Sequence, residues 1–214
     1  MSVSAKICGL SSTEAVAAAI DGGAFYLGFV FYPPSPRAVT PEQAEALCAK
    51  ARAGITRVGL FVDAEDAAIE AALAAAPIDL LQFHGAETPE RVVEARRRFA
   101  RPVMKAVAIA GPEDVLEAER YEDAADVLLF DAKPPRRPDA LPGGNGLAFD
   151  WRLIAERSWR RPWMLSGGLT AEVLPEAVRI SGAAAVDVSS GVESRPGIKD
   201  PEKIRAFLAA ARAL

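Results

Sequence analysis

The sequence predicts a single (β/α)8 barrel domain over residues 1–214, and three observations predict it. Short apolar runs alternate eight times with alanine-rich stretches, which is the pattern of that barrel. No linker of distinct composition interrupts the alternation. A doubly wound open sheet is the structural alternative, but it would more often carry a glycine-rich fingerprint after its first strand, and none is here.

Each predicted strand is a short apolar run with polar or turn-forming residues at its ends. The first strand closes with Lys6-Ile7-Cys8, and the eighth, at residues 183–186, leads to Asp187. The six strands between them are predicted at residues 26–31, 57–62, 79–83, 103–107, 126–130 and 163–165.

The predicted helices are recognised by their start and stop signals. Ser11 or Ser12 is a suitable cap for the first helix, at residues 13–20, and glycines follow its end. Thr40 precedes a proline at the start of the second helix, and Gln43 stands at capping-box spacing. The other helices are predicted at residues 65–75, 88–99, 112–121, 151–156, 171–179 and 201–213, and the longest irregular stretch at residues 131–149.

The composition argues against several classes of function. A net charge of −4 argues against a nucleic-acid surface, and no apolar run approaches the length of a membrane span. We therefore expect a small-molecule ligand, no nucleic-acid or membrane partner, and a monomer or a homodimer. The N-terminal residues lack the regions of a secretory signal, and two cysteines on different elements make no disulfide framework, which favours the cytoplasm. No Cys/His cluster has zinc-ligand spacing, so no metal is expected.

Two glycine-bearing segments near the C-terminal end indicate a phosphate site. Ser166-Gly167-Gly168 follows the seventh predicted strand, and Asp187-Val188-Ser189-Ser190-Gly191 follows the eighth. Backbone N–H groups without bulky side chains can approach an anion closely, and barrels often bind phosphate with these two loops. Either segment alone is as well explained by an ordinary glycine turn. Their joint position favours phosphate.

Three candidate reactive residues stand at strand C-termini, where the active sites of barrels lie. Cys8 ends the first strand, His84 the fourth and Asp131 the sixth. Asp131 follows a wholly apolar run, where a carboxyl keeps its proton more readily, as a general acid requires. Lys6 shares a strand face with Cys8, and its charge is expected to increase the thiolate fraction. Taken singly, the cysteine is better explained by packing and the aspartate by a turn, and the histidine is equally well explained by a structural hydrogen bond.

Two loops supply further candidates. Arg37 follows the stiff segment Pro33-Pro34-Ser35-Pro36, which would hold its planar guanidinium in place to bind a carboxylate. A solvated loop arginine is the alternative. The segment Gly143-Gly144-Asn145-Gly146 is a candidate lid or backbone that closes over a substrate, although any long loop favours such residues.

Taken together and in order, these segments resemble the phosphoribosylanthranilate isomerase family of tryptophan biosynthesis. Two small departures are Phe83, where leucine is expected, and Asn145, where a small hydroxyl residue is common; the loop at residues 132–141 also looks longer than in compact members. The matching segments span nearly the whole chain, at residues 6–9, 28–31, 35–37, 57–62, 82–85, 128–131, 143–146, 149–151, 165–169 and 186–193.

The resemblance implies a (β/α)8 fold and an Amadori rearrangement that needs no cofactor. N-(5-phosphoribosyl)anthranilate would become 1-(2-carboxyphenylamino)-1-deoxyribulose 5-phosphate. By similarity, Cys8 matches the general base, Asp131 the general acid and Arg37 the arginine near the anthranilate carboxylate. The two glycine-bearing segments match the phosphate site. The remaining residues expected to line the site are Lys6, His84, Gly144 and Asp187.

Two other functions remain open at this point. The related aminoaldose isomerisation of histidine biosynthesis would keep the fold and the phosphate site. Barrels for that reaction usually carry an aspartate after the first strand, where this chain has Cys8. A phosphosugar-binding protein without catalysis is the second alternative. The presence of both Cys8 and Asp131 disfavours it.

Overall fold

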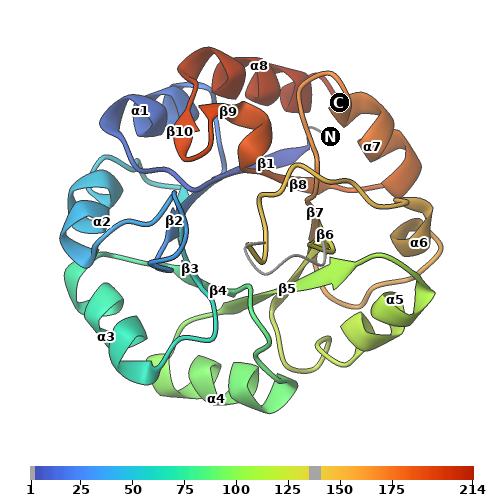
Figure 1. The fold of residues 1–214 in the computed structure, drawn as a ribbon, viewed down its shortest axis with the longest axis horizontal. Helices are drawn as coiled ribbons and strands as arrows, with labels where there is room; N and C mark the ends of the chain where they lie inside the picture. Colours follow the sequence, from blue (N-terminus) through green and yellow to red (C-terminus); the bar gives the residue numbers. More distant parts are fainter. Residues whose placement is uncertain (1–2, 135–140) are drawn as a thin grey trace.

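Eight parallel strands form a closed barrel in the computed structural model, and a ring of helices surrounds it (Figure 1). The structure describes residues 3–134 and 141–214. In chain order the strands are β1 (Ser4–Cys8), β2 (Tyr26–Val30), β3 (Thr56–Phe61), β4 (Leu80–Phe83), β5 (Val103–Ile109), β6 (Val127–Ala132), β7 (Trp163–Leu165) and β8 (Ala185–Val188).

The barrel closes because β8 pairs with both β7 and β1. In this register Lys6 of β1 lies opposite Asp187 of β8 on one side and Tyr26 of β2 on the other. The predicted (β/α)8 fold is therefore confirmed, and the open sheet is excluded.

The helices begin where the sequence places caps and prolines. The Ala15 N–H donates to Ser12 Oγ at 3.2 Å, so Ser12, rather than its neighbour, caps the first helix. Thr40 and Gln43 form the predicted capping box. The helices are α1 (Thr13–Asp21), α2 (Pro41–Cys48), α3 (Asp66–Ala75), α4 (Pro89–Phe99), α5 (Pro112–Glu119), α6 (Arg152–Ala155), α7 (Leu174–Ser181) and α8 (Pro201–Arg212). Among the described residues, none of these helices combines the length and apolar character needed to cross a bilayer.

Several predicted boundaries are wrong by one to three residues. Strand β8 continues through Asp187 to Val188, because its pairing with β1 extends over that stretch. Strand β6 likewise includes Asp131, which pairs with Ala108 of β5. Helix α7 begins at Leu174 rather than at residue 171, and turns occupy the three residues before it. Part of the predicted irregular stretch, residues 135–140, lies outside the described residues.

The segment after β8 forms structure that the sequence did not predict. A short 3-10 helix, η1 (Ser190–Val192), leads into an antiparallel pair, β9 (Glu193–Arg195) and β10 (Ile198–Lys199). At the turn between the two strands, Gly197 has a φ of 83°, and a Cβ there would lie 2.5 Å from the Pro36 carbonyl oxygen. The hairpin therefore packs directly against the loop that carries Arg37.

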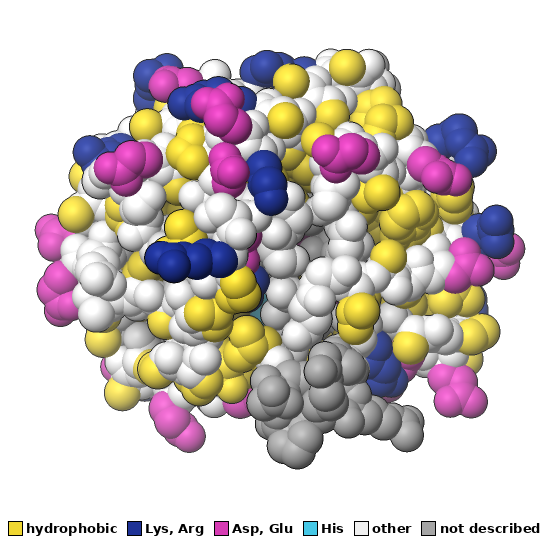
Figure 2. Space-filling model, turned by 45° about the horizontal axis from the view of Figure 1, so that its top comes forward, with side chains coloured by type: hydrophobic (Ala, Val, Ile, Leu, Met, Phe, Trp, Pro, Cys, Tyr) yellow, Lys and Arg dark blue, Asp and Glu magenta, His cyan; other side chains and the backbone are white. Residues whose placement is uncertain are grey.

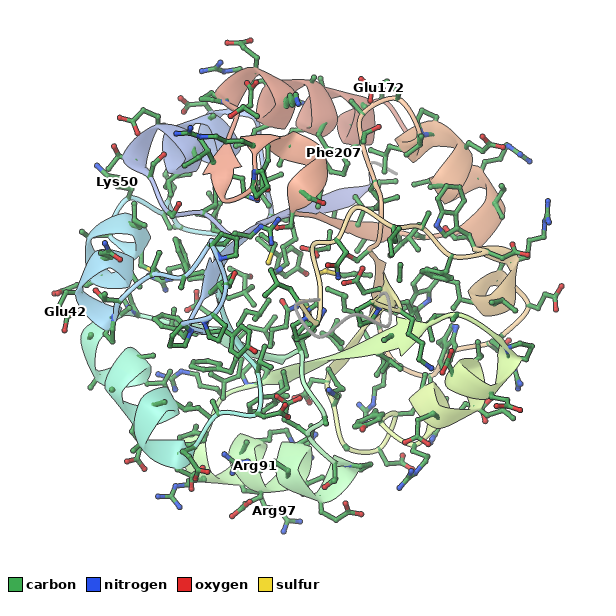
Figure 3. The ribbon with its side chains drawn as sticks, in the orientation of Figure 1. Glu42, Lys50, Arg91, Arg97, Glu172 and Phe207 are labelled. Atoms are coloured by element: carbon green, nitrogen blue, oxygen red, sulfur yellow. The ribbon has the colours of Figure 1, made fainter. Side chains whose placement is uncertain are left out.

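Apolar side chains fill two layers. One layer lies between the strands and the helices, where Phe207 of α8 points toward the barrel, whereas Glu42, Arg97 and Glu172 point outward (Figure 3). The second layer fills the inside of the barrel below its C-terminal end, from Val58, Leu80, Met104, Ala106, Leu129 and Met164. Because side chains alternate along a strand, the residues two positions beyond this inner layer face the open end.

Candidate active site

A cavity lies at the C-terminal ends of the strands and has a volume of about 740 Å³, counting its opening to solvent. The segment after β6, gold in Figure 1, passes over this end of the barrel. In the space-filling view, acidic and basic side chains are mixed around the periphery and form no patch of one sign on the face shown (Figure 2). The predicted site residues that line the cavity are Cys8, Arg37, His84, Asp131, Gly144, Gly167, Gly168, Asp187, Ser189, Ser190 and Gly191.

Lys6 does not line the cavity, contrary to our expectation. It is fully buried inside the barrel, two residues before Cys8 on the inner face of β1. Its Nζ donates to Asp187 Oδ1 at 2.9 Å, and Ser166 Oγ donates to Asp187 Oδ2 at 3.1 Å. Burial alone would lower the pKa of Lys6, but the charges and hydrogen bonds of Asp187 and Cys8 together outweigh burial and raise the pKa, so the ammonium persists. Lys6 therefore supports the cavity from below.

Burial raises the pKa of the Cys8 thiol above its ordinary value. Lys6 lowers that pKa, as the sequence predicted, but it does not overcome burial, and the nearby Asp187 opposes it. The predicted effect of Lys6 is therefore present, but burial makes the net pKa of Cys8 higher than its ordinary value. Gly28 of β2 leaves room for this group, because a Cβ there would lie 3.1 Å from Cys8 Sγ and 3.0 Å from Lys6 Nζ.

Asp131 faces the same cavity from β6 and contacts His84. Its Oδ2 lies 3.2 Å from His84 Nε2, and its Oδ1 accepts the Ala132 N–H at 2.9 Å. His84 Nδ1 lies 3.0 Å from Nε2 of Gln82, the residue two positions earlier on β4. His84 thus combines the two interpretations that the sequence left open, since it lines the cavity and also makes structural hydrogen bonds.

Arg37 is held in place, and it is not a solvated loop residue. It is 5% exposed, and its Nε and Nη2 donate to the two carboxylate oxygens of Glu193 at 2.7 and 3.0 Å. Its Nη2 also donates to the Gly144 carbonyl oxygen at 3.2 Å. Within the described residues, Arg37 Nη1 makes no hydrogen bond. One edge of the guanidinium is therefore fixed, and a donor remains for a ligand.

Lys199 of β10 joins the arginine to the loop after β8. Its Nζ donates to Glu193 Oε1 at 2.8 Å, and to Ser189 O and Oγ at 2.9 and 3.2 Å. Burial alone would raise the pKa of Glu193, but hydrogen bonds and charges from Arg37 and Lys199 bring it below its ordinary value. Two cations therefore share one buried carboxylate beside the loop predicted to bind phosphate.

The two glycine-bearing loops present backbone to the cavity. Gly167 and Gly168 have φ angles of 89° and 64°, which favour glycine, and their N–H groups make no hydrogen bond within the part of the chain described. A Cβ on Gly168 would lie 2.9 Å from the Leu147 carbonyl carbon, so the loop before α6 packs against this backbone. Such unpaired N–H groups beside buried cations suit an anion.

Sequence reasoning missed three residues of this site: Gln82, Glu193 and Lys199. Gln82 could have been predicted, because it shares a strand face with His84. Ser166 belongs to a predicted segment, but its hydrogen bond to Asp187 was not predicted. Glu193 and Lys199 lie on the hairpin that was not predicted. Among residues 3–134 and 141–214, no group of His, Cys, Asp and Glu is arranged to hold a metal ion.

Comparison with known proteins identifies the relatives of this chain. Residues 5–210 match the family model described as N-(5'-phosphoribosyl)anthranilate (PRA) isomerase. The curated N-(5'-phosphoribosyl)anthranilate isomerase of Paracoccus denitrificans is 57% identical over 214 residues, which cover 100% of this chain and 99% of that protein. The chain belongs to the N-(5'-phosphoribosyl)anthranilate isomerase family.

Solved structures of N-(5'-phosphoribosyl)anthranilate isomerases share the fold along the whole chain. Monomers of the dimeric enzyme from Thermotoga maritima superpose with a TM-score of 0.85 at 35% identity, covering 99% of this chain and 100% of theirs. A second structure of such an isomerase, in complex with reduced 1-(o-carboxyphenylamino)-1-deoxyribulose 5-phosphate, has a TM-score of 0.85 at 34% identity with the same coverage. The family resemblance expected from the sequence is confirmed.

Replacing Glu193 with glutamine should destabilise the fold at neutral pH by about 3 kcal/mol, because two buried cations lose their shared anion. The lowered pKa of Glu193 means that its contribution is complete above the ordinary carboxyl range and is lost as the pH falls through the folded-state value. The difference in unfolding free energy between wild type and Glu193→Gln should therefore shrink in acid. Urea denaturation at several pH values measures it.

The matched control is Glu176→Gln, because within the part of the chain described the Glu176 carboxylate makes a single, exposed ion pair, with Arg179. It should change stability by less than about 1 kcal/mol at any pH. Equal losses in the two variants would show that the buried cluster does not stabilise the fold.

Proposed function

We propose that this chain catalyses the Amadori rearrangement of N-(5'-phosphoribosyl)anthranilate to 1-(2-carboxyphenylamino)-1-deoxyribulose 5-phosphate in tryptophan biosynthesis. The observation that carries the proposal is a single cavity that contains a thiol, a carboxyl, a held guanidinium and two glycine-bearing loops. Family membership supports the same reaction. The ligand is a phosphosugar, no cofactor takes part, and the enzyme acts in the cytoplasm as a monomer or a homodimer.

The substrate carries an anion at each end, and the cavity offers a separate cationic or N–H-rich site for each. The phosphate binds the backbone of Gly167, Gly168 and the loop at residues 189–191, next to the charge of Lys199. The anthranilate carboxylate binds Arg37 through Nη1, the donor that Glu193 leaves free. Binding at both ends fixes the sugar between the two reactive groups, which lowers the entropic part of the barrier.

Asp131 acts as the general acid. Its proton passes to the furanose ring oxygen, the bond between that oxygen and sugar C1 breaks, and the substrate nitrogen takes the positive charge as an iminium. Asp131 Oδ2 lies 3.2 Å from His84 Nε2, so the imidazole is within hydrogen-bond distance of the acid. A positioned acid contributes typically about 10²–10⁴-fold to such a step.

Cys8 acts as the general base. The iminium acidifies the proton on sugar C2, and the Cys8 thiolate removes it, which leaves an enolamine that tautomerises to the ketone. Since burial raises the pKa of Cys8, the thiolate is scarce at neutral pH but is a stronger base when it forms. Lys6, directly beneath, limits the cost of forming that charge.

Replacing Cys8 with serine should lower kcat at least about 100-fold, because a hydroxyl cannot form an anion near neutral pH. Cys48 provides the control, since it is also buried and its pKa is raised by burial to about 12, but it lies outside the cavity. Loss of anthranilate fluorescence measures both rates. Normal turnover by Cys8→Ser would show that the thiol serves only in packing.

Replacing Asp131 with asparagine keeps the shape of the side chain but removes the transferable proton. We expect kcat to fall about 10²–10⁴-fold while the product-like ligand still binds. Asp123→Asn is the control, because that carboxylate is exposed and remote from the cavity. Steady-state fluorescence assays and calorimetric binding separate the two effects, and near-normal turnover by Asp131→Asn would exclude the acid role.

Replacing Arg37 with alanine should chiefly raise KM, by about 10- to 100-fold, because a charge-assisted hydrogen bond to the substrate is lost. Arg52→Ala removes an exposed arginine whose ion pair among the described residues is with Asp21 at the surface, and it should leave KM unchanged. The same fluorescence assay gives both constants. An unaltered KM in Arg37→Ala would contradict the carboxylate contact.

A further inference from the structure

We propose that Gln82 is a positioning residue whose carboxamide selects the ring tautomer of His84 and thereby controls whether Asp131 holds its proton. This inference rests on the acid role proposed above for Asp131. It assigns to Gln82 and His84 the task of returning the acid to its protonated form after each turnover.

Gln82 is a polar side chain in an apolar place. It is fully buried on the inner face of β4, and its register neighbours are Leu60 of β3 and Met104 of β5. Its Nε2 reaches His84 Nδ1 at 3.0 Å. Its Oε1 is buried and has no hydrogen-bond partner among the described residues. An apolar side chain would complete the inner layer at less cost, so the amide needs another explanation.

The contact between His84 and Asp131 is shielded from solvent. The side chains of His84 and Asp131 are only 11% and 8% exposed. Gly143 covers them, because a Cβ on that residue would lie 2.6 Å from His84 Nε2 and 2.9 Å from Asp131 Oδ2. A proton shared by the two groups is therefore governed mainly by their few direct partners.

The observed arrangement corresponds to the pair without its extra proton. Gln82 Nε2 can only donate, so His84 Nδ1 accepts and carries no hydrogen. The ring hydrogen is then on Nε2 and is donated to Asp131 Oδ2, which must be a carboxylate oxygen. This is the resting state of the pair without its transferable proton, and it leaves Gln82 Oε1 without a partner.

The acid-ready state requires the opposite tautomer. When Asp131 carries the proton, its O–H donates to His84 Nε2, and the ring hydrogen moves to Nδ1. That hydrogen needs an acceptor, which Gln82 supplies when its carboxamide rotates by half a turn and presents Oε1. If the extra proton were instead on the ring, giving a His84 imidazolium beside an Asp131 carboxylate, Nδ1–H would need the same acceptor. An extra proton on either residue therefore requires the rotated Gln82 amide.

This arrangement resets the acid. When substrate is bound, the Asp131 O–H turns from His84 Nε2 to the furanose oxygen, and its proton passes to that oxygen. The Asp131 carboxylate then faces the lone pair of Nε2, and that repulsion favours taking a proton back. Glutamine suits both states because its donor and its acceptor occupy equivalent positions on one carbon. A side chain with only one of the two would fix the pair in a single state.

Other ionisable groups are near but do not intervene. Cys8, Tyr32, Arg37 and Asp187 line the same cavity. Behind β4, Lys105 donates to the Gly85 carbonyl oxygen and pairs with Glu87, and Asp63 accepts the Ala86 N–H. Within the part of the chain that the structure describes, none of these side chains makes a hydrogen bond to Gln82, His84 or Asp131.

The test uses the fact that His84 is the single histidine of the chain. A ¹⁵N spectrum of the imidazole in the intact protein therefore reports one ring, and it distinguishes hydrogen on Nε2 from hydrogen on Nδ1. In the wild type we expect the Nε2–H form at high pH and conversion to a form with hydrogen on Nδ1 as the pH falls.

Gln82→Leu and Gln82→Glu should move the pair in opposite directions. Leucine offers no acceptor for Nδ1–H, so the pair of His84 and Asp131 should bind its extra proton about tenfold more weakly. The conversion of the ring to the Nδ1–H form and the alkaline limb of kcat/KM should therefore both shift to lower pH by about one pH unit. Glutamate keeps the acceptor, so the Nδ1–H form should persist to higher pH and turnover should be retained. Gln43→Leu, in the exposed cap of α2, should change neither readout.

The outcomes are separable. Gln82→Leu with an unchanged histidine spectrum and pH profile would overturn the inference, and so would shifts of the same sign in the leucine and glutamate variants. Near-normal turnover by Asp131→Asn would instead remove the acid role itself, whatever Gln82 does. The spectrum needs no turnover, so it is readable even in a variant with little activity.

Discussion

A buried ion pair joins the first strand of the barrel to the last. Lys6 and Asp187 meet at 2.9 Å in register across β1 and β8, and neither can be left unpaired in the interior without a large cost. A slip of one strand by one residue would turn its charge into the apolar layer under the helices and leave the other charge unpaired. The pair therefore selects the register of closure. Because Cys8 lies two residues further along β1 and Ser189 directly follows β8, that register also places the thiol and the loop expected to bind phosphate.

Buried charges have opposite consequences at the two ends of the cavity. Beneath Cys8, Lys6 and Asp187 balance each other, so burial dominates and the pKa of the thiol rises. Around Arg37, two cations share the one carboxylate of Glu193, and the surplus positive charge is already fixed in place before a ligand arrives. Charge that is preorganised in this way lowers the stability of the fold, but the side chains then need little rearrangement when a ligand binds. The arrangement beneath Cys8 suits proton transfer, and the arrangement around Arg37 suits the binding of anions.

The sequence predicted what depends on local pattern. Alternation of apolar and helical segments gave the order of elements, and strand ends placed Cys8, His84 and Asp131 on one cavity. The features that the sequence did not predict depend on contacts between residues far apart in the chain. Asp187 looked like the residue that ends a strand, because only Lys6, 181 positions away, makes its charge tolerable inside the barrel. The hairpin that carries Glu193 is two short strands without a distinctive pattern, and its packing against the Arg37 loop is not readable from spacing. The net effect on the Cys8 pKa depends on the extent of burial, which no sequence pattern states.

The reactivity of the cavity is set largely by the residues beside and beneath it. On β1 and on β4 a polar side chain lies fully buried one step below the residue that faces the cavity, Lys6 under Cys8 and Gln82 under His84. The inner face of β6 is apolar beneath Asp131, so the acid has no such support on its own strand. His84 supplies it from the side. Each group proposed to transfer a proton thus depends on one buried polar residue, through direct contact for the thiol and through an imidazole for the carboxyl. This difference suits the proposed tasks, because a thiolate is stabilised by a fixed charge, whereas an acid that gains and loses a proton is served by a partner with both a donor and an acceptor.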